Sequence, residues 1–269
     1  MEGEHRLSNE AAALELEQAA RQASAVKPLR NRIQDSSLES AYAVQELQTR
    51  AGLAAGRRLA GRKVGLTSVA VQRQLGVDRP DFGMLFEDMN VPTGELVAHG
   101  RLIQPKVEGE VAFLMGRELV SGQLTLADAV HAVEAVCAAI EIVDSRIENW
   151  DIGLFDTVAD NGSSGLYVLG RDFHSLHGLD LDTCGMVMDQ DGEAVSFGVG
   201  AACLGHPLQA LVWLARTMAS CGRPLGPGDI VLSGALGPMV AARPGSVYSA
   251  RIAGLGSVQV AFAPSPSTH

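Results

Sequence analysis

The segment Gln104-Pro105-Lys106-Val107-Glu108-Gly109-Glu110-Val111-Ala112-Phe113-Leu114 places two carboxylates in an otherwise apolar run. Successive side chains of a β-strand point to opposite faces, so Glu108 and Glu110 fall on the same face. Ala112 and Leu114 continue that face, and Val107, Gly109, Val111 and Phe113 form the opposite one, so both faces turn apolar. This pattern is typical of a strand covered on both sides, which would turn the two glutamates toward the interior.

Two carboxylates on one buried face need a partner. At roughly 3.3 Å of rise per residue, Glu108 and Glu110 would lie about 7 Å apart. At that separation like charges raise each other's pKa unless a cation lies between them. Oxygen ligands favour Mg²⁺, Mn²⁺ or Ca²⁺ over Zn²⁺. The alternative is that the pair lies at the solvated end of an edge strand.

The composition is that of an ordinary globular protein. The chain has 269 residues, of which 46% are hydrophobic, enough for a substantial core. Its 30 glycines and 11 prolines, with few aromatic residues, favour short strands and turns over a helical bundle. The net charge of -10 argues against a nucleic-acid partner, which needs a concentrated basic surface. We therefore expect a small-molecule or protein partner.

The cysteines and the N-terminal residues indicate the cellular compartment. The four cysteines lie far apart in apolar or helical contexts, which predicts reduced core residues at Cys137, Cys184, Cys203 and Cys221. Residues 1–6 are charged and lack the apolar centre of a signal peptide. No apolar run reaches the roughly 18 residues of a membrane span. These features predict a cytoplasmic location and no membrane partner.

The first 55 residues are predicted to be helical. Ser8 can cap a helix that continues to about residue 24. A second helix is predicted from Ser37 to about residue 51, ending at Gly52. We expect these helices to provide packing or oligomer surface, because they carry no pattern typical of catalysis.

A strand is predicted at residues 59–67, where Lys63 shares a face with Gly61 and Gly65, which leave space beside the lysine. A short helix is predicted to follow over residues 68–75. Residues 76–86 mix turn residues with apolar side chains, and we expect a loop, half anchored to the core, that covers a substrate.

Another acid lies inside an apolar strand predicted at residues 138–146. Glu141 has apolar neighbours on both sides. A lone buried glutamate is more often paired with an arginine than bound to a metal, and Arg146 is available for such a pair. Alternatively, Glu141 joins Glu108 and Glu110, since three carboxylates would balance a divalent cation and leave coordination positions open for a substrate.

Helices and strands neither alternate regularly nor form one all-β block, which predicts an α+β fold with a curved mixed β-sheet. The glycines around Ser163 lack the spacing of a Gly-x-Ser-x-Gly nucleophile elbow, and residues 198–203 lack the third glycine of a dinucleotide-binding loop. The remaining predicted elements are helices at 125–137 and 207–221 and strands at 166–170, 229–233, 246–252 and 257–262.

Five motifs together are specific. They are Gly-Arg-Lys-Val-Gly-Leu-Thr at 61–67, Gln-Leu-Gly-Val-Asp-Arg-Pro-Asp-Phe-Gly at 74–83, Glu108-x-Glu110 with Glu141, Asp-Thr-Val-Ala-Asp-Asn at 156–161 and Cys-Leu-Gly-His-Pro-Leu at 203–208. This set resembles the 2-keto-4-pentenoate hydratases of the fumarylacetoacetate hydrolase superfamily. The resemblance covers nearly the whole chain, although Glu-x-Glu alone would be a weak signal.

The resemblance implies a single catalytic domain over residues 1–269, built as a mixed β-roll. Within it we expect an N-terminal helical segment at 1–56, a metal-binding β-rich core at 57–262 and a flexible tail at 263–269. The resemblance also implies a Mg²⁺ or Mn²⁺ site and a homo-oligomer. Its implied metal ligands are Glu108, Glu110 and Glu141.

The resemblance further implies Lys63 and Asp81 as catalytic groups, and Ser163 and Leu66 as substrate-binding residues. Relatives often have alanine where this chain has Gly109 and Gly162, a small change that keeps the ligand directions. Asp144 is expected to lie outside the ligand set.

The implied reaction is the hydration of 2-hydroxypenta-2,4-dienoate to 4-hydroxy-2-oxopentanoate in the meta-cleavage degradation of aromatic compounds. The substrate would chelate the metal, a Lewis acid, through its C1 carboxylate and 2-oxygen. Lys63 and Asp81 would form a coupled acid–base pair for the proton added at C5 and the water added at C4. The sequence does not assign either residue to either proton.

Other functions stay open. A 4-oxalocrotonate decarboxylase would have a similar metal site, but those enzymes lack an acid corresponding to Asp81. An acylpyruvate hydrolase would need a histidine-containing acid–base arrangement, which these motifs do not contain. From a different class, the chain could be a non-catalytic partner subunit. The resemblance also permits a complex with a downstream aldolase or an upstream decarboxylase.

Overall fold

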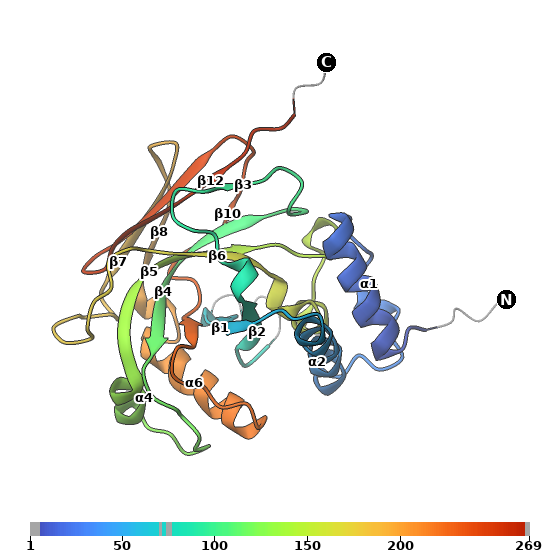
Figure 1. Ribbon diagram of the computed structural model, residues 1–269, viewed down its shortest axis with the longest axis horizontal. Coiled ribbons are helices and arrows are strands. Elements are labelled where there is room, and N and C mark those ends of the chain that lie inside the picture. The colour runs from blue at the N-terminus through green and yellow to red at the C-terminus, as the bar shows by residue number, and fades with distance from the viewer. Residues whose placement is uncertain (1–5, 70–71, 74–76, 267–269) are drawn as a thin grey trace.

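Two mixed β-sheets form the centre of the computed structural model, which describes residues 6–69, 72–73 and 77–266 (Figure 1). The strands are β1 (Leu59–Gly65), β2 (Asp81–Phe86), β3 (Leu96–Val97), β4 (Lys106–Met115), β5 (Val133–Val143), β6 (Ser164–Leu169), β7 (Gly185–Gln190), β8 (Glu193–Val199), β9 (Ile230–Leu232), β10 (Val240–Ala241), β11 (Val247–Ile252) and β12 (Gly256–Phe262). One sheet has the order β2-β1-β9-β4-β5-β6, with β10 also pairing with β4, and the other has the order β3-β12-β11-β7-β8. The pairs β1/β9 and β3/β12 are parallel and the others are antiparallel, which confirms the predicted α+β fold with a mixed sheet.

Helices flank the sheets on two sides (Figure 1). They are α1 (Asn9–Gln22), α2 (Leu38–Ala54), α4 (Leu126–Ala132), α5 (Leu154–Ala159) and α6 (Pro207–Ser220), with short 3-10 turns η1 (Leu29–Asn31), η2 (Glu87–Met89), η3 (Glu148–Trp150), η4 (Asn161–Ser163) and η5 (Gly200–Ala202). Helix α2 packs on α1 and α5, whereas α6 packs on α4 and β1. The α5–η4 segment therefore links the N-terminal helices to the sheet.

The main core lies around β4 and β5. Val107, Val111 and Phe113 are fully buried on one face of β4, and every residue on its other face is buried or half-buried. Strand β4 lies between β5 and β9, so the alternative of a solvated edge strand is wrong. Burying each large apolar side chain contributes roughly 1.5–3 kcal/mol, which makes this strand a major source of stability.

The predicted helix starts are confirmed by their caps. Ser8 accepts a hydrogen bond from the backbone N–H of Ala11 at 3.3 Å, and Ser37 does the same for Ser40 at 3.1 Å. Thr125 begins α4 through reciprocal bonds with the residue three positions later. Such caps each stabilise a helix by about 1 kcal/mol. They are recognisable in the sequence because donor and acceptor lie within one turn.

Two glycines serve close packing rather than the roles predicted for them. Helix α2 continues past Gly52, where a Cβ atom would lie 3.0 Å from Cζ of Phe86, so this glycine allows the helix to approach β2. At Gly61 a Cβ atom would lie 1.8 Å from the carbonyl oxygen of Ile230, so this glycine allows β1 to pair with β9.

The boundary between α4 and β5 lies earlier than predicted. Helix α4 ends at Ala132, and the strand begins at Val133 rather than at residue 138. The reason is tertiary, because Val136 pairs with Phe113 of β4 and both side chains are fully buried. The helices and strands predicted at 207–221, 229–233, 246–252 and 257–262 are confirmed as α6, β9, β11 and β12.

The loop predicted at 76–86 is wrong over its second half. Asp81–Phe86 forms β2, and all six residues are buried. Pairing with β1, in which Gly65 lies opposite Asp81, overrides the turn-forming composition of the segment. The helix predicted at 68–75 falls partly outside the described residues.

The cysteine prediction is correct for three residues. Cys137, Cys184 and Cys203 are buried, whereas Cys221 is exposed just after α6.

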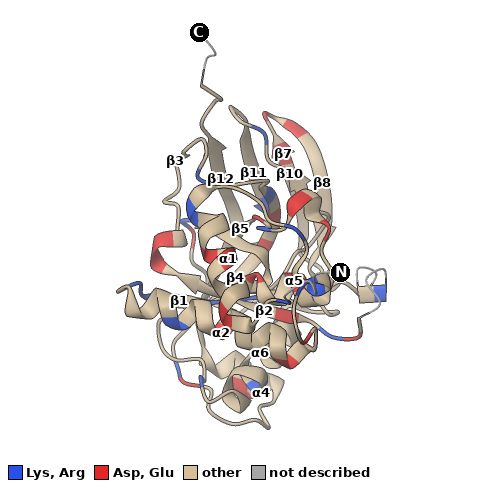
Figure 2. Ribbon diagram, turned by 90° about the vertical axis from the view of Figure 1, so that its right-hand side faces the viewer, with Lys and Arg blue, Asp and Glu red and all other residues tan. Residues whose placement is uncertain are grey.

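None of the helices in the described part of the chain is long and apolar enough to cross a membrane. In Figure 2, basic and acidic segments are interspersed along the ribbon.

Candidate active site

Three glutamates converge where β4 pairs with β5. Glu108 lies directly opposite Glu141 in the antiparallel ladder, and Glu110 shares the face of Glu108 because strand side chains alternate. One carboxylate oxygen from each residue lies within 4.8 Å of the others. Glu110 and Glu141 are fully buried and Glu108 is half-buried, so the cluster is more accessible on the side of Glu108.

The carboxylate oxygens of this cluster fit a divalent cation. Oε2 of Glu110 accepts a hydrogen bond from the backbone N–H of Gly234 at 2.8 Å. Oε1 of Glu110 and both carboxylate oxygens of Glu141 are buried and accept no hydrogen bond in the described structure, although Oε1 of Glu141 forms an ion pair with Lys63. Buried polar atoms normally have partners, and oxygen ligands are those that Mg²⁺ and Mn²⁺ prefer.

The electrostatics of the cluster favour a cation as well. Burial, with the nearby charge of Glu141 acting in the same direction, raises the pKa of Glu108 to about 7. Burial also raises the pKa of Glu110 well above its usual range, with Glu141 and Glu108 adding to the effect. A bound divalent cation would oppose these effects and keep the carboxylates ionised.

Lys63 on β1 contacts the glutamate cluster. Its Nζ lies 3.3 Å from Oε1 of Glu141, and the side chain is buried. Burial lowers the pKa of Lys63, but Glu141, Asp81 and the two glutamates of β4 together raise that pKa above its ordinary value. Lys63 is therefore held as an ammonium ion beside the carboxylates.

Asp81, the first residue of β2, lies beside Lys63. A Cβ atom on Gly65 would lie 2.1 Å from Oδ1 of Asp81 and 3.5 Å from Nζ of Lys63, so this glycine leaves space for both side chains, as predicted. Burial raises the pKa of Asp81, and Lys63 partly opposes the shift. Thr157 on α5 donates to Oδ2 of Asp81 at 3.5 Å. The structure thus brings a buried carboxyl group and a buried ammonium group together.

Ser163 and Leu66 both have left-handed backbones, with φ of 52° and 55°. Ser163 ends η4, and its hydroxyl donates to Oδ2 of Asp160 at 3.3 Å. Its turn touches the lysine at Gly162, where a Cβ atom would lie 2.7 Å from Cε of Lys63. Leu66 follows β1 directly and is half-buried, and no hydrogen bond or ion pair links it to the carboxylates in the described structure.

Arg146 does not pair with Glu141, so that alternative is wrong. It forms a buried ion pair with Asp160 instead, and its backbone N–H also donates to Asp160 at 3.0 Å. Asp144 accepts hydrogen bonds from the backbone N–H groups of Ile103 and Gln104 at 3.0 and 2.7 Å, and so holds the chain that leads into β4.

The sequence reasoning missed Thr157, Asp160 and Gly234 as residues that surround the site. Asp160 and Thr157 belong to a quoted motif, but no local pattern indicates what they contact. Gly234 acts through its backbone N–H, which carries no signal in a sequence.

Comparison with known proteins gives the family. Residues 57–263 match the family described as fumarylacetoacetate (FAA) hydrolase C-terminal. The chain belongs to the fumarylacetoacetate hydrolase family. Among family members, it is 58% identical to 2-keto-4-pentenoate hydratase 1 of Dechloromonas aromatica (strain RCB), over 96% of this chain and 98% of that one. It is 60% identical to the TodF product hydratase of Pseudomonas putida (strain F1), over 92% of each chain.

A solved structure of the fumarylacetoacetate hydrolase type also matches closely. It is 4-oxalocrotonate decarboxylase from Pseudomonas putida G7, complexed with magnesium and adipate. The two chains are 35% identical and superpose with a TM-score of 0.91, which covers 94% of this chain and 97% of the decarboxylase.

Proposed function

We propose that this protein is a hydro-lyase that converts 2-hydroxypenta-2,4-dienoate (2-keto-4-pentenoate) to 4-hydroxy-2-oxopentanoate in the meta-cleavage degradation of aromatic compounds. The observation that carries the proposal is the cluster of Glu108, Glu110 and Glu141 with the buried Lys63 and Asp81 beside it. The two relatives at 58% and 60% identity, both named hydratases, support this reaction.

The three glutamates are the proposed ligands of a divalent cation, Mg²⁺ or Mn²⁺. The buried oxygens of Glu110 and Glu141 that accept no hydrogen bond support this assignment, as does the magnesium in the similar decarboxylase structure. When bound, the cation supplies Lewis-acid stabilisation of the negative charge that develops on the 2-oxygen of the substrate.

Lys63 and Asp81 are the proposed acid–base pair. The dienol loses its O–H proton and gains a proton at C5, and water then adds as hydroxide at C4 and as a proton at C3. The ammonium group of Lys63 can donate a proton and the carboxylate of Asp81 can accept one, so the pair can carry these transfers. Ser163 and Leu66 are proposed to contact the substrate, since both lie in segments that adjoin Lys63.

A second candidate is 4-oxalocrotonate decarboxylase activity, favoured by the TM-score of 0.91 to that enzyme. The buried Asp81 and the higher identity to hydratases favour hydration. A non-catalytic partner subunit is the third candidate.

Assays with two substrates, run with and without a chelator, separate the three candidates. The purified protein with Mg²⁺ or Mn²⁺ is expected to remove the absorbance of 2-hydroxypenta-2,4-dienoate without release of carbon dioxide, and EDTA is expected to stop the reaction. Release of carbon dioxide from 4-oxalocrotonate at comparable efficiency would instead identify a decarboxylase. Turnover of neither substrate, in a folded and metal-loaded protein, would favour the partner subunit.

The cytoplasmic location, the homo-oligomeric state, the domain boundaries and the association with an aldolase or decarboxylase stay predictions.

A further inference from the structure

Strand β2 is an edge strand, and its outer peptide groups are bound by a side chain. The backbone N–H of Met84 donates to Oδ1 of Asn161 at 2.7 Å, and Nδ2 of Asn161 donates to the carbonyl oxygen of Met84 at 2.9 Å. A primary amide has both a donor and an acceptor. It thus reproduces the paired hydrogen bonds that a neighbouring antiparallel strand would make.

The backbone of Asn161 begins an unusual turn. Asn161, Gly162 and Ser163 all have left-handed backbones, with φ of 57°, 61° and 52°. Among residues with a Cβ atom, asparagine adopts this conformation most readily. The turn needs external contacts to persist, because a run of left-handed residues is costly for side chains other than glycine.

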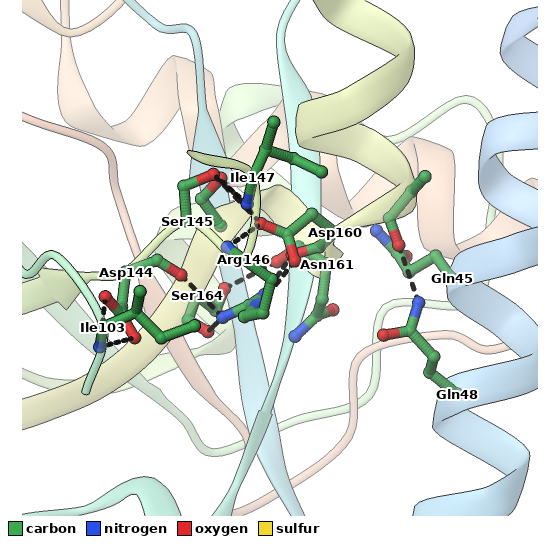
Figure 3. Close-up of polar contacts among 12 residues, drawn as sticks. Gln45, Gln48, Ile103, Asp144, Ser145, Arg146, Ile147, Asp160, Asn161 and Ser164 are labelled. Atoms are coloured by element: carbon green, nitrogen blue, oxygen red, sulfur yellow. Dashed lines mark hydrogen bonds and ion pairs between the residues drawn. The ribbon is translucent and has the colours of Figure 1, made fainter. Parts of the chain in front are cut away.

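Those contacts come from two sides. Figure 3 shows Arg146 and Asp160 pointing toward one another, with Asn161 directly after Asp160. Arg146 also donates to the carbonyl oxygens of Asp160 and Ser164, which bracket the turn. The buried Arg146–Asp160 ion pair therefore anchors the turn to the segment just after β5, and Asn161 anchors it to β2.

The turn packs directly on the acid–base pair. A Cβ atom on Gly162 would lie 2.7 Å from Cε and 3.3 Å from Nζ of Lys63. A Cβ atom on Gly83 would lie 2.3 Å from the carbonyl oxygen of Asn161, so β2 and the turn touch backbone to backbone. Asp81 begins the same strand, β2. A displaced turn would therefore move Lys63 relative to Asp81.

We propose that Asn161 is a positioning residue, whose side-chain amide docks the turn at residues 160–163 onto Met84 and thereby holds Lys63 and Asp81 in their reactive arrangement. The glutamates lie on β4 and β5, and no hydrogen bond of Asn161 in the described structure reaches them. The catalytic part of this proposal rests on the proposed hydration, whereas the docking does not.

The test uses Asn161→Gly, because glycine adopts the left-handed backbone without strain and only the amide is lost. The matched control is Asn149→Gly, since Asn149 has φ of 58° and an exposed side chain. We expect Asn161→Gly to lower kcat by about 10- to 100-fold, the effect of a misplaced reacting group. In Asn161→Gly, KM and the Mn²⁺ dissociation constant are expected to stay unchanged. In Asn149→Gly, kcat, KM and the Mn²⁺ dissociation constant are all expected to match those of the wild type.

Hydrogen exchange measures the docking without any substrate. The backbone amide of Met84 is expected to exchange faster in Asn161→Gly than in the wild type, and at the wild-type rate in Asn149→Gly. Asn161→Asp keeps the acceptor for this amide and loses only the donor to the carbonyl, so it is expected to preserve more protection than Asn161→Gly.

Unchanged exchange at Met84 would overturn the docking. Faster exchange with normal kcat, or a fall in kcat matched by equal losses of metal affinity and thermal stability, would overturn the positioning role. A wild-type protein that does not hydrate the dienoate would overturn the proposed function and its catalytic consequence, while the exchange rates would still decide the docking.

Discussion

Glu108 on β4 and Glu141 on β5 lie directly opposite one another across an antiparallel strand pair. Like charges in this position destabilise a sheet, and Glu110 adds a third carboxylate within 4.8 Å. The ammonium group of Lys63, at 3.3 Å from Glu141, balances one of the three charges. Two negative charges stay uncompensated within this group when all three glutamates are ionised, which matches the charge of one Mg²⁺ or Mn²⁺ ion.

Metal binding is expected to stabilise the folded protein. At a metal concentration 100 times the dissociation constant, the free energy of unfolding should rise by about 2.7 kcal/mol. Thermal unfolding with Mn²⁺ and with EDTA measures this difference, and Glu110→Gln should reduce it. Equal melting temperatures with and without metal would contradict a site at these glutamates.

Glu108→Gln is expected to abolish metal-dependent turnover without unfolding the protein. The amide keeps the size of the side chain and removes a charge that faces Glu141, so the metal-free variant should be at least as stable as the wild type. Calorimetry with Mn²⁺, thermal unfolding and the hydration assay provide the readouts. Glu118→Gln, at an exposed position, is the control. Wild-type metal affinity and activity in Glu108→Gln would refute the ligand assignment.

Lys63→Met and Asp81→Asn are each expected to lower kcat by about 10²- to 10⁴-fold, the usual contribution of a general acid or base. Because the two groups act as a unit, kcat of the double variant should be little lower than kcat of the less active single variant. Both single variants should still bind Mn²⁺. Lys27→Met, at an exposed lysine, controls for the loss of a positive charge. Additive losses in the double variant would argue that the two residues act independently.

Gly65→Ala is expected to disturb Asp81 directly. The added Cβ atom would lie 2.1 Å from Oδ1 of Asp81, so the carboxylate must move. Overpacking of this kind costs typically 1–3 kcal/mol of stability, and kcat should fall as well. Gly122→Ala is the matched control, because no atom lies within 4 Å of the position of its Cβ. Urea unfolding and the hydration assay of both variants check the prediction, which fails if the two behave alike.

Asp160 is expected to make stability depend on pH. Burial raises its pKa to about 6, although Arg146 opposes the shift, whereas an unfolded aspartate has a pKa of about 3.9. The folded protein therefore holds this proton more tightly than the unfolded chain does. The contribution of Asp160 to the free energy of unfolding is therefore fully present below about pH 4 and is lost as the pH rises through 6. The loss is about 3 kcal/mol, at 1.36 kcal/mol per unit of pKa difference.

Urea unfolding of the wild type and of Asp160→Asn between about pH 4 and pH 7 isolates this contribution, because the asparagine does not ionise. The difference in stability between the two proteins should change across that window. A difference that stays constant would show that Asp160 does not titrate there.

Local signals were enough for several elements of the fold. The caps at Ser8, Ser37 and Thr125 join groups within one helical turn, so the sequence alone predicts where those helices begin. The alternation in β4 likewise predicts a strand with two glutamates on one face. By contrast, Asp81–Phe86 looks like a loop, because its strand form depends on pairing with β1, which local composition does not report.

The candidate site divides in the same way. Acidic residues within apolar strands are visible in the sequence, and the family resemblance supplied the roles proposed for Lys63 and Asp81. The partners of Glu141 and Arg146 were not visible. Strand register sets Glu141 against Glu108, and the turn after α5 brings Asp160 to Arg146. These pairings required the tertiary structure because they depend on how separate segments pack, whereas residue type and periodicity describe each segment alone.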